Sequence, residues 1–232
     1  MNQAEFDKFA DEYASLHAGN IAISGEDPAY FAEYKMRDLA GEYARRGARG
    51  AVPDVLDFGA GIGNSIPWLK KYLPEARLTC LDVSARSLEI STHRYGELAQ
   101  FVCFDGGRLP FADASFDLAY AACVFHHIEH AEHVRLLGEL RRVLRPGGML
   151  AVFEHNPYNP LTVRTVRDCA FDDNARLIDA GTMCRRAREA GFSAVHRRYR
   201  IFFPRPLKAL RGLEKYMTWL ALGAQYYALA IR

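Results

Sequence analysis

The chain has 232 residues, half of them hydrophobic and a quarter charged, which excludes a disordered or low-complexity protein. This length favours one main core with an appendage. Thirty Lys and Arg side chains against 28 Asp and Glu leave a formal net charge of +2, far from the basic excess of a protein that binds nucleic acid through its phosphates. We therefore expect no nucleic-acid partner.

Cysteine usage and apolar stretches indicate the compartment. The five cysteines include no C-x-x-C pair, and Cys80 and Cys103 stand in apolar runs where thiols pack as small hydrophobic groups. The first residues lack the basic and apolar regions of a signal peptide, and no stretch approaches the ~18 apolar residues of a membrane span. We expect a cytoplasmic protein without stable membrane insertion, either a monomer or a homodimer.

Residues 1–50 predict a helical cover, and residues 51–232 predict the main domain. Short apolar runs in the main domain lack polar alternation, as strands buried on both faces do. Helical patterns over residues 65–72 and 85–95 separate the first three runs. This alternation predicts an α/β fold, a mostly parallel sheet with helices on both faces. The first five predicted strands are residues 55–57, 78–82, 101–105, 116–122 and 149–154.

The second half of the chain predicts two further strands. Apolar residues between 136 and 144 share one helical face, and Pro146-Gly147-Gly148 is expected to end that helix and turn the chain into the fifth strand. A short helix over 182–190 precedes strand candidates at 195–203 and 225–231. The sheet should therefore have seven strands, with the last one antiparallel.

The segment from residue 156 to residue 181 shows no firm helical or strand pattern. Its 26 residues exceed an ordinary connection. We interpret residues 155–182 as a loop or insert near an acceptor site, with helical turns or a missed element as the alternative.

A glycine-rich loop follows the first predicted strand and opens a helix. Glycines at 59, 61 and 63 let the backbone come close to a ligand that a Cβ would push away, which indicates a nucleotide-like ligand. The dinucleotide fingerprint G-x-G-x-x-G would place its third glycine at position 64, where this chain has Asn64. The loop therefore departs from the pattern of nicotinamide-binding proteins.

The glycine-rich loop is the first of several motifs that follow one another along the chain. They are Asp57-Phe58-Gly59-Ala60-Gly61-Ile62-Gly63, Asp82, Asp105-Gly106, Leu109-Pro110-Phe111 with Ser115-Phe116-Asp117, Val124-Phe125-His126-His127-Ile128, and Leu144-Arg145-Pro146-Gly147-Gly148. Together these motifs resemble those of the class I S-adenosylmethionine-dependent methyltransferases, in the small-molecule (type 11-like) branch. The resemblance covers roughly residues 50 to 155.

The resemblance implies S-adenosylmethionine as cofactor and S-adenosylhomocysteine as product. Asp82 would accept hydrogen bonds from both ribose hydroxyls and Asp105 would bind the adenine amino group, roles that suit acceptor-only carboxylates. Asp57 would hold the glycine loop or the ligand's ammonium group. Capping or turn aspartates are the alternative for Asp82 and Asp105. The full set of implied cofactor-binding residues is Asp57, Gly59, Ala60, Gly61, Asn64, Asp82, Val83, Asp105, Gly106, Ala122 and Tyr13.

An acceptor site is expected where Glu154 and the residues after it leave the carboxyl end of the fifth strand, the edge where open α/β sheets bind ligands. Asn156 and Tyr158 are the candidate substrate-binding residues, with a plain Asn-Pro turn as the alternative. Methyl transfer to a hydroxyl needs a base, and His127 or His155 could take the proton. Glu154 is the other candidate if burial raises its pKa.

No metal is expected. His126 and His130 have the i,i+4 spacing of metal ligands, but the H-E-x-x-H order is absent, and we interpret His130 and His133 as solvated. The resemblance therefore implies metal-independent methylation of a small molecule at oxygen or nitrogen. A non-catalytic S-adenosylmethionine-binding module, a nicotinamide-dependent oxidoreductase and a nucleic-acid methyltransferase are the alternatives.

The chain beyond residue 195 mixes basic and aromatic residues. Such a mixture could cover an apolar or anionic acceptor, or touch a membrane surface peripherally. We favour a last strand pair joined by an amphipathic helix, since an edge strand with one buried face shows this alternation.

Overall fold

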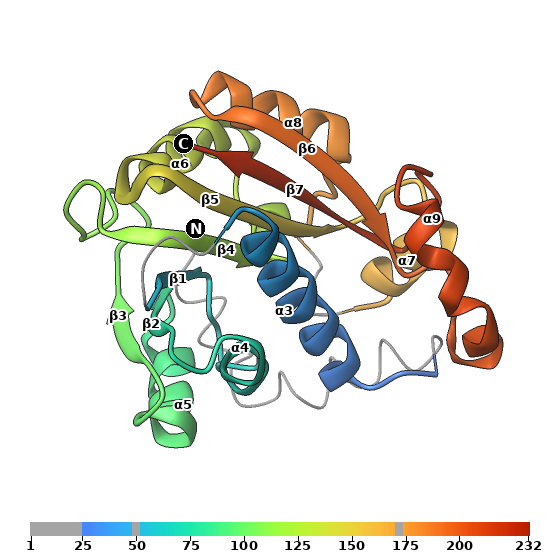
Figure 1. Ribbon diagram of the computed structural model, residues 1–232, viewed down its shortest axis with the longest axis horizontal. Helices are drawn as coiled ribbons and strands as arrows, with labels where there is room; N and C mark the ends of the chain where they lie inside the picture. The colour runs from blue at the N-terminus through green and yellow to red at the C-terminus, as the bar shows by residue number, and fades with distance from the viewer. Residues whose placement is uncertain (1–24, 48–51, 170–173) are drawn as a thin grey trace.

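The computed structural model describes residues 25–47, 52–169 and 174–232. They form a seven-stranded sheet of order β3-β2-β1-β4-β5-β7-β6 (Figure 1). Neighbours from β3 to β5 pair in parallel, and β7 runs antiparallel to both β5 and β6, which confirms the predicted fold class. The strands are β1 (Asp54–Phe58), β2 (Arg77–Asp82), β3 (Gln100–Cys103), β4 (Phe116–Ala122), β5 (Leu144–His155), β6 (Ser193–Arg200) and β7 (Gln225–Ile231).

Helices cover both faces of this sheet. The apolar residues of α3 and α4 share one buried cluster with alternate residues of the strands, and those of α6 and α8 share the other. Side chains that accept from backbone N–H groups fix where helices begin: Asp27 before α3 and Asp179 before α8. The helices are α3 (Pro28–Arg45), α4 (Ile66–Tyr72), α5 (Ala85–Tyr95), η2 (Phe125–His127), η3 (His130–Glu132), α6 (His133–Val143), α7 (Pro160–Arg167), α8 (Ala180–Glu189), η5 (Arg205–Leu213) and α9 (Glu214–Met217).

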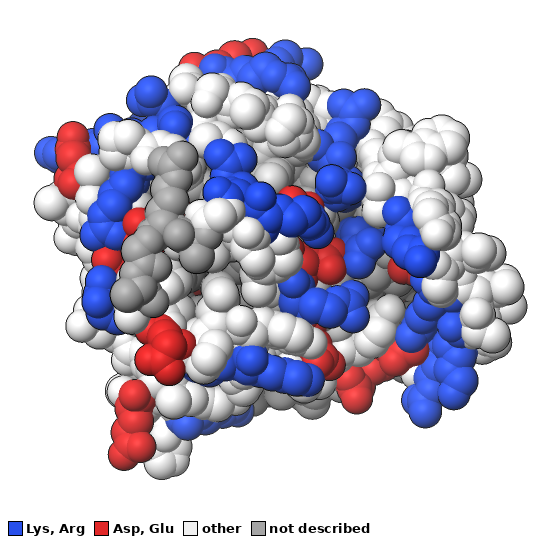
Figure 2. All heavy atoms as spheres, in the orientation of Figure 1, with Lys and Arg blue, Asp and Glu red and all other residues white. Residues whose placement is uncertain are grey.

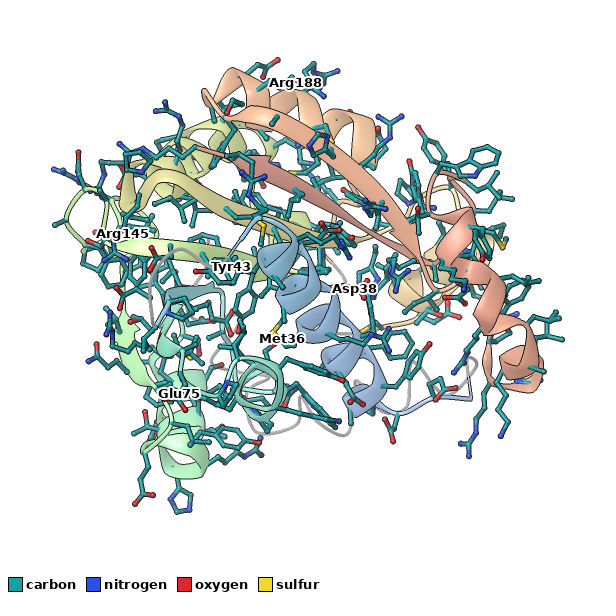
Figure 3. The ribbon with its side chains drawn as sticks, in the orientation of Figure 1. Met36, Asp38, Tyr43, Glu75, Arg145 and Arg188 are labelled. Atoms are coloured by element: carbon teal, nitrogen blue, oxygen red, sulfur yellow. The ribbon has the colours of Figure 1, made fainter. Side chains whose placement is uncertain are left out.

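Charged pairs fasten α3 to the last two strands. Asp38 of α3, labelled in Figure 3, forms an ion pair with Arg200 of β6, and its Oδ1 accepts from Arg200 Nη2 at 3.1 Å. Tyr227 of β7 donates to Glu42 at 2.7 Å. This places one helix of the predicted amino-terminal cover against strands 162 to 185 residues later in the chain. The rest of that cover, residues 1–24, lies outside the described residues, and so does the candidate Tyr13.

Helix α7 lies within residues 156–181 and confirms the alternative interpretation of this segment, a missed element. Asn159 accepts from the backbone N–H of Thr162 and caps this helix, and Pro160 occupies its first turn. The amphipathic segment of eight residues was too short to stand out among polar neighbours.

Two other expectations need correction. The Pro146-Gly147-Gly148 turn was expected before the fifth strand, but α6 ends at Val143 and the three residues lie within β5. Phe116 pairs with Leu144 while Leu118 pairs with Met149, so residues 145–148 form a bulge. His133 was expected in solvent, yet it is fully buried, with Ile128 O 3.0 Å from its Nε2.

No helix in the described ranges combines the length and the hydropathy needed to cross a membrane.

Leu39 tests how much α3 contributes to the fold. It is 1% exposed in the cluster beneath α3, so Leu39→Ala should lower the free energy of unfolding by roughly 2–4 kcal/mol in urea denaturation. The matched control is Leu98→Ala, whose side chain is 41% exposed and should change stability by less than about 0.5 kcal/mol. Equal losses in the two variants would show that α3 does not share the core.

Candidate functional site

The strand order reverses between β1 and β4, and in open α/β sheets such a reversal marks the crevice in which a ligand binds. The chain runs outward from β1 to β2 and β3, then returns to place β4 on the other side of β1. Loops after β1 and β4 therefore leave the same edge in opposite directions, which is where open α/β sheets bind ligands. The predicted cofactor residues at 57–64, 82–83, 105–106 and 122 all stand at this carboxyl edge.

The glycine loop needs its glycines for two different reasons. Gly59 has a φ of +78°, and a Cβ there would lie 2.5 Å from Val124 Cγ2, so only glycine allows the loop to pack on the turn after β4. Gly61, with a φ of +52°, would direct a Cβ away from the protein, since no described atom lies within 4 Å. The backbone at Gly61 is therefore open to a ligand.

Asp82 holds this loop in place. Its Oδ2 accepts from the Gly61 N–H at 2.7 Å and its Oδ1 accepts from the Ser84 N–H at 2.9 Å. Asp82 is 7% exposed, and a carboxylate oxygen can accept more than one hydrogen bond. The prediction that Asp82 is a capping or turn residue and the prediction that it binds a ligand are thus compatible.

Asp105 lies at the next strand end and is exposed. Its Oδ1 accepts from the Gly107 N–H at 2.8 Å, and Gly106 has a φ of +83°. Arg135 of α6 donates to the carbonyls of Gly106 and Gly107, which fixes the turn. This Asx-type turn presents the carboxylate at the rim of the crevice.

Asp57 lies beneath the loop rather than on its surface. It is 1% exposed and accepts from the Tyr120 hydroxyl at 2.7 Å. Burial, together with the nearby Asp82 carboxylate, raises the pKa of Asp57 to about 7, although the Tyr120 hydrogen bond opposes the change. A cation placed above the loop would favour the ionised form of this carboxyl group.

Glu154 is a support for the crevice and not a free base. It is fully buried, and its Oε1 accepts from the backbone N–H groups of Val124 and Phe125 while its Oε2 lies 2.6 Å from His126 Nδ1. Burial alone would raise the pKa of Glu154, but His126 and the N–H of Phe125 hold it below its ordinary value. The condition under which Glu154 could act as base, a raised pKa, is therefore not met.

His127 and His155 flank this buried pair. The ring centroid of His126 lies 4.1 Å from that of His127 and 5.3 Å from that of His155. Gln225 accepts from the Tyr34 hydroxyl through Oε1, which leaves its Nε2 to donate to His155 Nδ1 at 3.3 Å. This arrangement puts the proton of a neutral His155 on Nε2.

A thiol between these groups was not singled out from the sequence. Cys123 follows β4 with a φ of +62°, and its Sγ lies 3.3 Å from Nζ of Lys35, which is 8% exposed on α3. Burial opposes ionisation, but the Lys35 ammonium and the His155 imidazole outweigh it and lower the pKa of Cys123 to about 7. The only sequence signal was a polar residue directly after the fourth strand.

Asn156 and Tyr158 do not converge on the crevice. Asn156 is buried, its amide nitrogen donates to the carbonyls of Ala221 and Gly223, and its oxygen accepts from the Tyr158 N–H. With these bonds made, Asn156 fixes a turn, as the alternative interpretation predicted. The Tyr158 ring is 60% exposed on the outer surface. The prediction that these two residues bind substrate is therefore not supported by the geometry.

Within the described part of the chain, no three His, Cys, Asp or Glu side chains converge as metal ligands would.

Comparisons with known proteins agree with this geometry. The family described as "Methyltransferase domain" matches residues 56–152. A demethylmenaquinone methyltransferase of Thermotoga maritima is 37% identical over 105 residues, 45% of this chain and 44% of that enzyme. A demethylmenaquinone methyltransferase of Renibacterium salmoninarum is 32% identical over 174 residues, 72% of this chain and 68% of that enzyme.

The chain belongs to the class I S-adenosylmethionine-dependent methyltransferases.

A solved structure extends the similarity in fold to nearly the whole chain. A methyltransferase of Thermotoga maritima, described as a possible histamine N-methyltransferase, superimposes with a TM-score of 0.67 over 99% of this chain and 98% of that one. At 18% identity this shows the shared fold alone. The match to the Thermotoga demethylmenaquinone methyltransferase spans less than half the length of that enzyme.

The residues of the crevice fit S-adenosylmethionine. Gly61 leaves its backbone open, Asp82 is a carboxylate that can accept from hydroxyl donors, and Asp105 stands at the rim where an amino group could reach it. Asp57, beneath the loop, would complement the cation of the ligand. Val83, which is buried, and Ala122, Ala60 and Asn64, which are partly buried, line the same edge, and their individual contacts with the cofactor stay predictions.

Asp57→Asn tests the buried carboxyl group. Because its folded pKa lies above the unfolded value, Asp57 stabilises the fold when protonated, and this stability falls as the pH rises from about 4 through 7. Asp57→Asn should therefore gain roughly 2–3 kcal/mol relative to the wild type between pH 5 and pH 8 in urea unfolding. A pH-independent difference between the two proteins would contradict the raised pKa.

Lys35→Met tests the charge around Cys123. Removal of the ammonium should raise the pKa of Cys123 from about 7 toward its ordinary value of 9.0. The readout is a pH titration of thiolate absorbance, taken as the difference between each protein and its Cys123→Ser counterpart. Lys71→Met, at an exposed lysine of α4, should leave that titration unchanged. If the two lysine variants behave alike, Lys35 does not set the charge of the thiol.

Proposed function

We propose that this chain methylates a small molecule whose hydroxyl group ionises, at that oxygen or at a conjugated carbon, without a metal. The observation that supports this most is the cluster of Lys35, Cys123 and His155 beside the glycine loop. Demethylmenaquinone, named in the two relatives above, belongs to a class with such hydroxyl groups in its reduced form.

The charges of the cluster suit an oxyanion better than an amine. Methyl transfer is an in-line displacement in which the electron-rich acceptor loses negative charge as the sulfonium loses positive charge. The bound cofactor supplies an electrophilic methyl group. A nearby ammonium, that of Lys35, would stabilise the ionised acceptor, whereas the buried Glu154 carboxylate is balanced by His126.

Cys123 is our choice for the base, with His127 as its competitor. The thiolate would take the hydroxyl proton of the acceptor on Sγ, and the new bond from acceptor to methyl carbon would form as the carbon–sulfur bond breaks, leaving S-adenosylhomocysteine. His155, with its Nδ1 facing Gln225, would position and stabilise the thiolate. His127 is partly exposed, and its imidazole could accept the proton instead.

Calorimetric titration with S-adenosylmethionine, S-adenosylhomocysteine and nicotinamide adenine dinucleotide tests the cofactor. Asp82→Ala should weaken both adenosyl ligands at least roughly tenfold, since hydrogen bonds to a charged group contribute about 1.5–3 kcal/mol each. The control is Asp113→Ala, an exposed carboxylate in an ion pair with Arg142, which should bind as the wild type does. Heat with the dinucleotide alone would favour an oxidoreductase.

Formation of S-adenosylhomocysteine with phenols, reduced quinones, amines and transfer RNA then tests the acceptor. We expect turnover with the first two classes, and a fall of roughly 100-fold or more in kcat for Cys123→Ser, with loss of the rate change near pH 7. A similar fall in His127→Gln, but not in Cys123→Ser, would make His127 the base. Binding without turnover across the panel would favour a non-catalytic module.

A further inference from the structure

Exposed apolar side chains gather on one end of the molecule. Ten large hydrophobic residues of the described ranges are exposed, and nine of them lie in two segments, 158–163 and 207–222. Single exposed apolar residues are ordinary, but a contiguous patch marks a binding surface. The nine, here called the apolar patch, are Tyr158, Leu161, Val163, Leu207, Leu210, Leu213, Tyr216, Trp219 and Leu222.

The two segments of the apolar patch are joined by hydrogen bonds. Asn156 donates to Ala221 O at 3.0 Å, Asn159 to Leu222 O at 2.8 Å, and Thr162 to Ala224 O at 2.9 Å. In Figure 1, α7 and α9 accordingly lie at the same end of the molecule. The turn fixed by Asn156 therefore brings the two segments side by side.

Helix η5 presents a ridge to solvent instead of packing on the core. Leu207, Leu210 and Leu213 recur at every third residue, the spacing that aligns side chains along one edge of a 3-10 helix, although the backbone bends at Leu207. They are 48%, 42% and 52% exposed, and η5 contains no buried residue. The predicted last strand pair joined by a helical segment is present, and the apolar side of η5 faces solvent.

The charges within the patch have one sign. Arg205, Lys208 and Lys215 are exposed between the apolar residues. The only acidic residue from 205 to 222, Glu214, is 9% exposed and accepts from the backbone N–H groups of residues 202 and 203. Figure 2 shows this end of the molecule as white surface, with Lys and Arg and also Asp and Glu at its lower margin.

We infer that the apolar patch docks on the surface of an anionic phospholipid bilayer. Leucines flanked by lysines, with Trp219 and Tyr216 at 75% and 69% exposure, have the composition of segments that lie in the membrane interface. Lysine is depleted in protein–protein interfaces, which disfavours a protein partner. Each Lys or Arg near an anionic surface adds about 1 kcal/mol to binding.

The position of the patch connects docking to the crevice. Helix α7 follows β5, and η5 follows β6, which runs parallel to β5 because both are antiparallel to β7. Both segments therefore leave the carboxyl edge of the sheet, the edge that holds the cofactor residues. If the proposed function holds, docking would bring the crevice close to acceptors that reside in the bilayer.

Sedimentation of the full chain with phospholipid vesicles tests this inference. We expect binding to vesicles that contain phosphatidylglycerol, weaker binding to pure phosphatidylcholine, and a loss of binding at high salt. The Lys208→Glu/Lys215→Glu variant should bind anionic vesicles at least roughly tenfold more weakly. Its control is Arg94→Glu, an exposed charge on α5 outside the patch, which should bind as the wild type does.

The double variant Leu213→Asp/Trp219→Asp tests the apolar contribution to vesicle binding. Its control is Leu98→Asp, because Leu98 is the one exposed large hydrophobic residue of the described ranges that lies outside the apolar patch. The double variant should lose binding to both vesicle types, and the control should keep it. Calorimetry with S-adenosylhomocysteine in the absence of vesicles checks that each variant is folded, and separates a failure of docking from a failure of the proposed cofactor site.

No vesicle binding by the wild type, or equal binding by Leu98→Asp and the double variant, would overturn the inference. Concentration-dependent self-association that only the double variant loses, together with no vesicle binding, would show that the patch joins two copies of the chain.

Discussion

The close packing of two turns at the centre of the sheet is the constraint on which the site depends. Gly59 and Val124 leave adjacent strands, and their contact has no room for a Cβ on the glycine. Asp82 fixes the first turn through Gly61, and Glu154 fixes the second through its backbone N–H groups. Both carboxylates are buried, so neither turn can move without leaving a charged group unsatisfied.

Because both turns are fixed, the carboxyl edge of the sheet can bind a ligand on one side and hold groups that exchange protons on the other. On the β2 side the backbone at Gly61 is open and acceptor oxygens face it, which suits the polar groups of a nucleoside. On the β5 side the groups that meet are the Lys35 ammonium, imidazoles and the Cys123 thiol, whose pKa is lowered to about 7. The ligand-binding residues stand at the ends of β1 and β2, and the groups that can exchange protons stand at the ends of β4 and β5. The two sets therefore lie on neighbouring strands.

Local sequence patterns predicted the parts of the fold that depend on local burial. Continuous apolar runs identified the central strands, since strands buried on both faces are apolar throughout, and β6 was identified as an edge strand with one buried face. The bulge at residues 145–148 depends on pairing across strands, and the burial of His133 depends on Arg186 and on Ile128, which no local pattern shows. Helix α7 was missed because its stability comes from contacts with residues 221–224.

The candidate site likewise contains residues that local sequence patterns predict and residues whose roles depend on contacts between distant parts of the chain. The glycines and Asp82 could be predicted because strand ends at one sheet edge must lie together. The role of Glu154 required knowledge that its carboxylate reaches the turn after β4. The contact between Lys35 and Cys123 joins residues 88 positions apart, and the patch joins α7 to η5 and α9, so neither follows from spacing along the chain.

The most direct test of the account is a crystal structure of the chain with S-adenosylhomocysteine bound. The account predicts that the ribose hydroxyls lie on the Asp82 carboxylate, that the backbone of Gly61 contacts the ligand, and that the thioether sulfur faces Cys123 and His155. A ligand bound away from the glycine loop, or a sulfur directed away from Cys123, would contradict it.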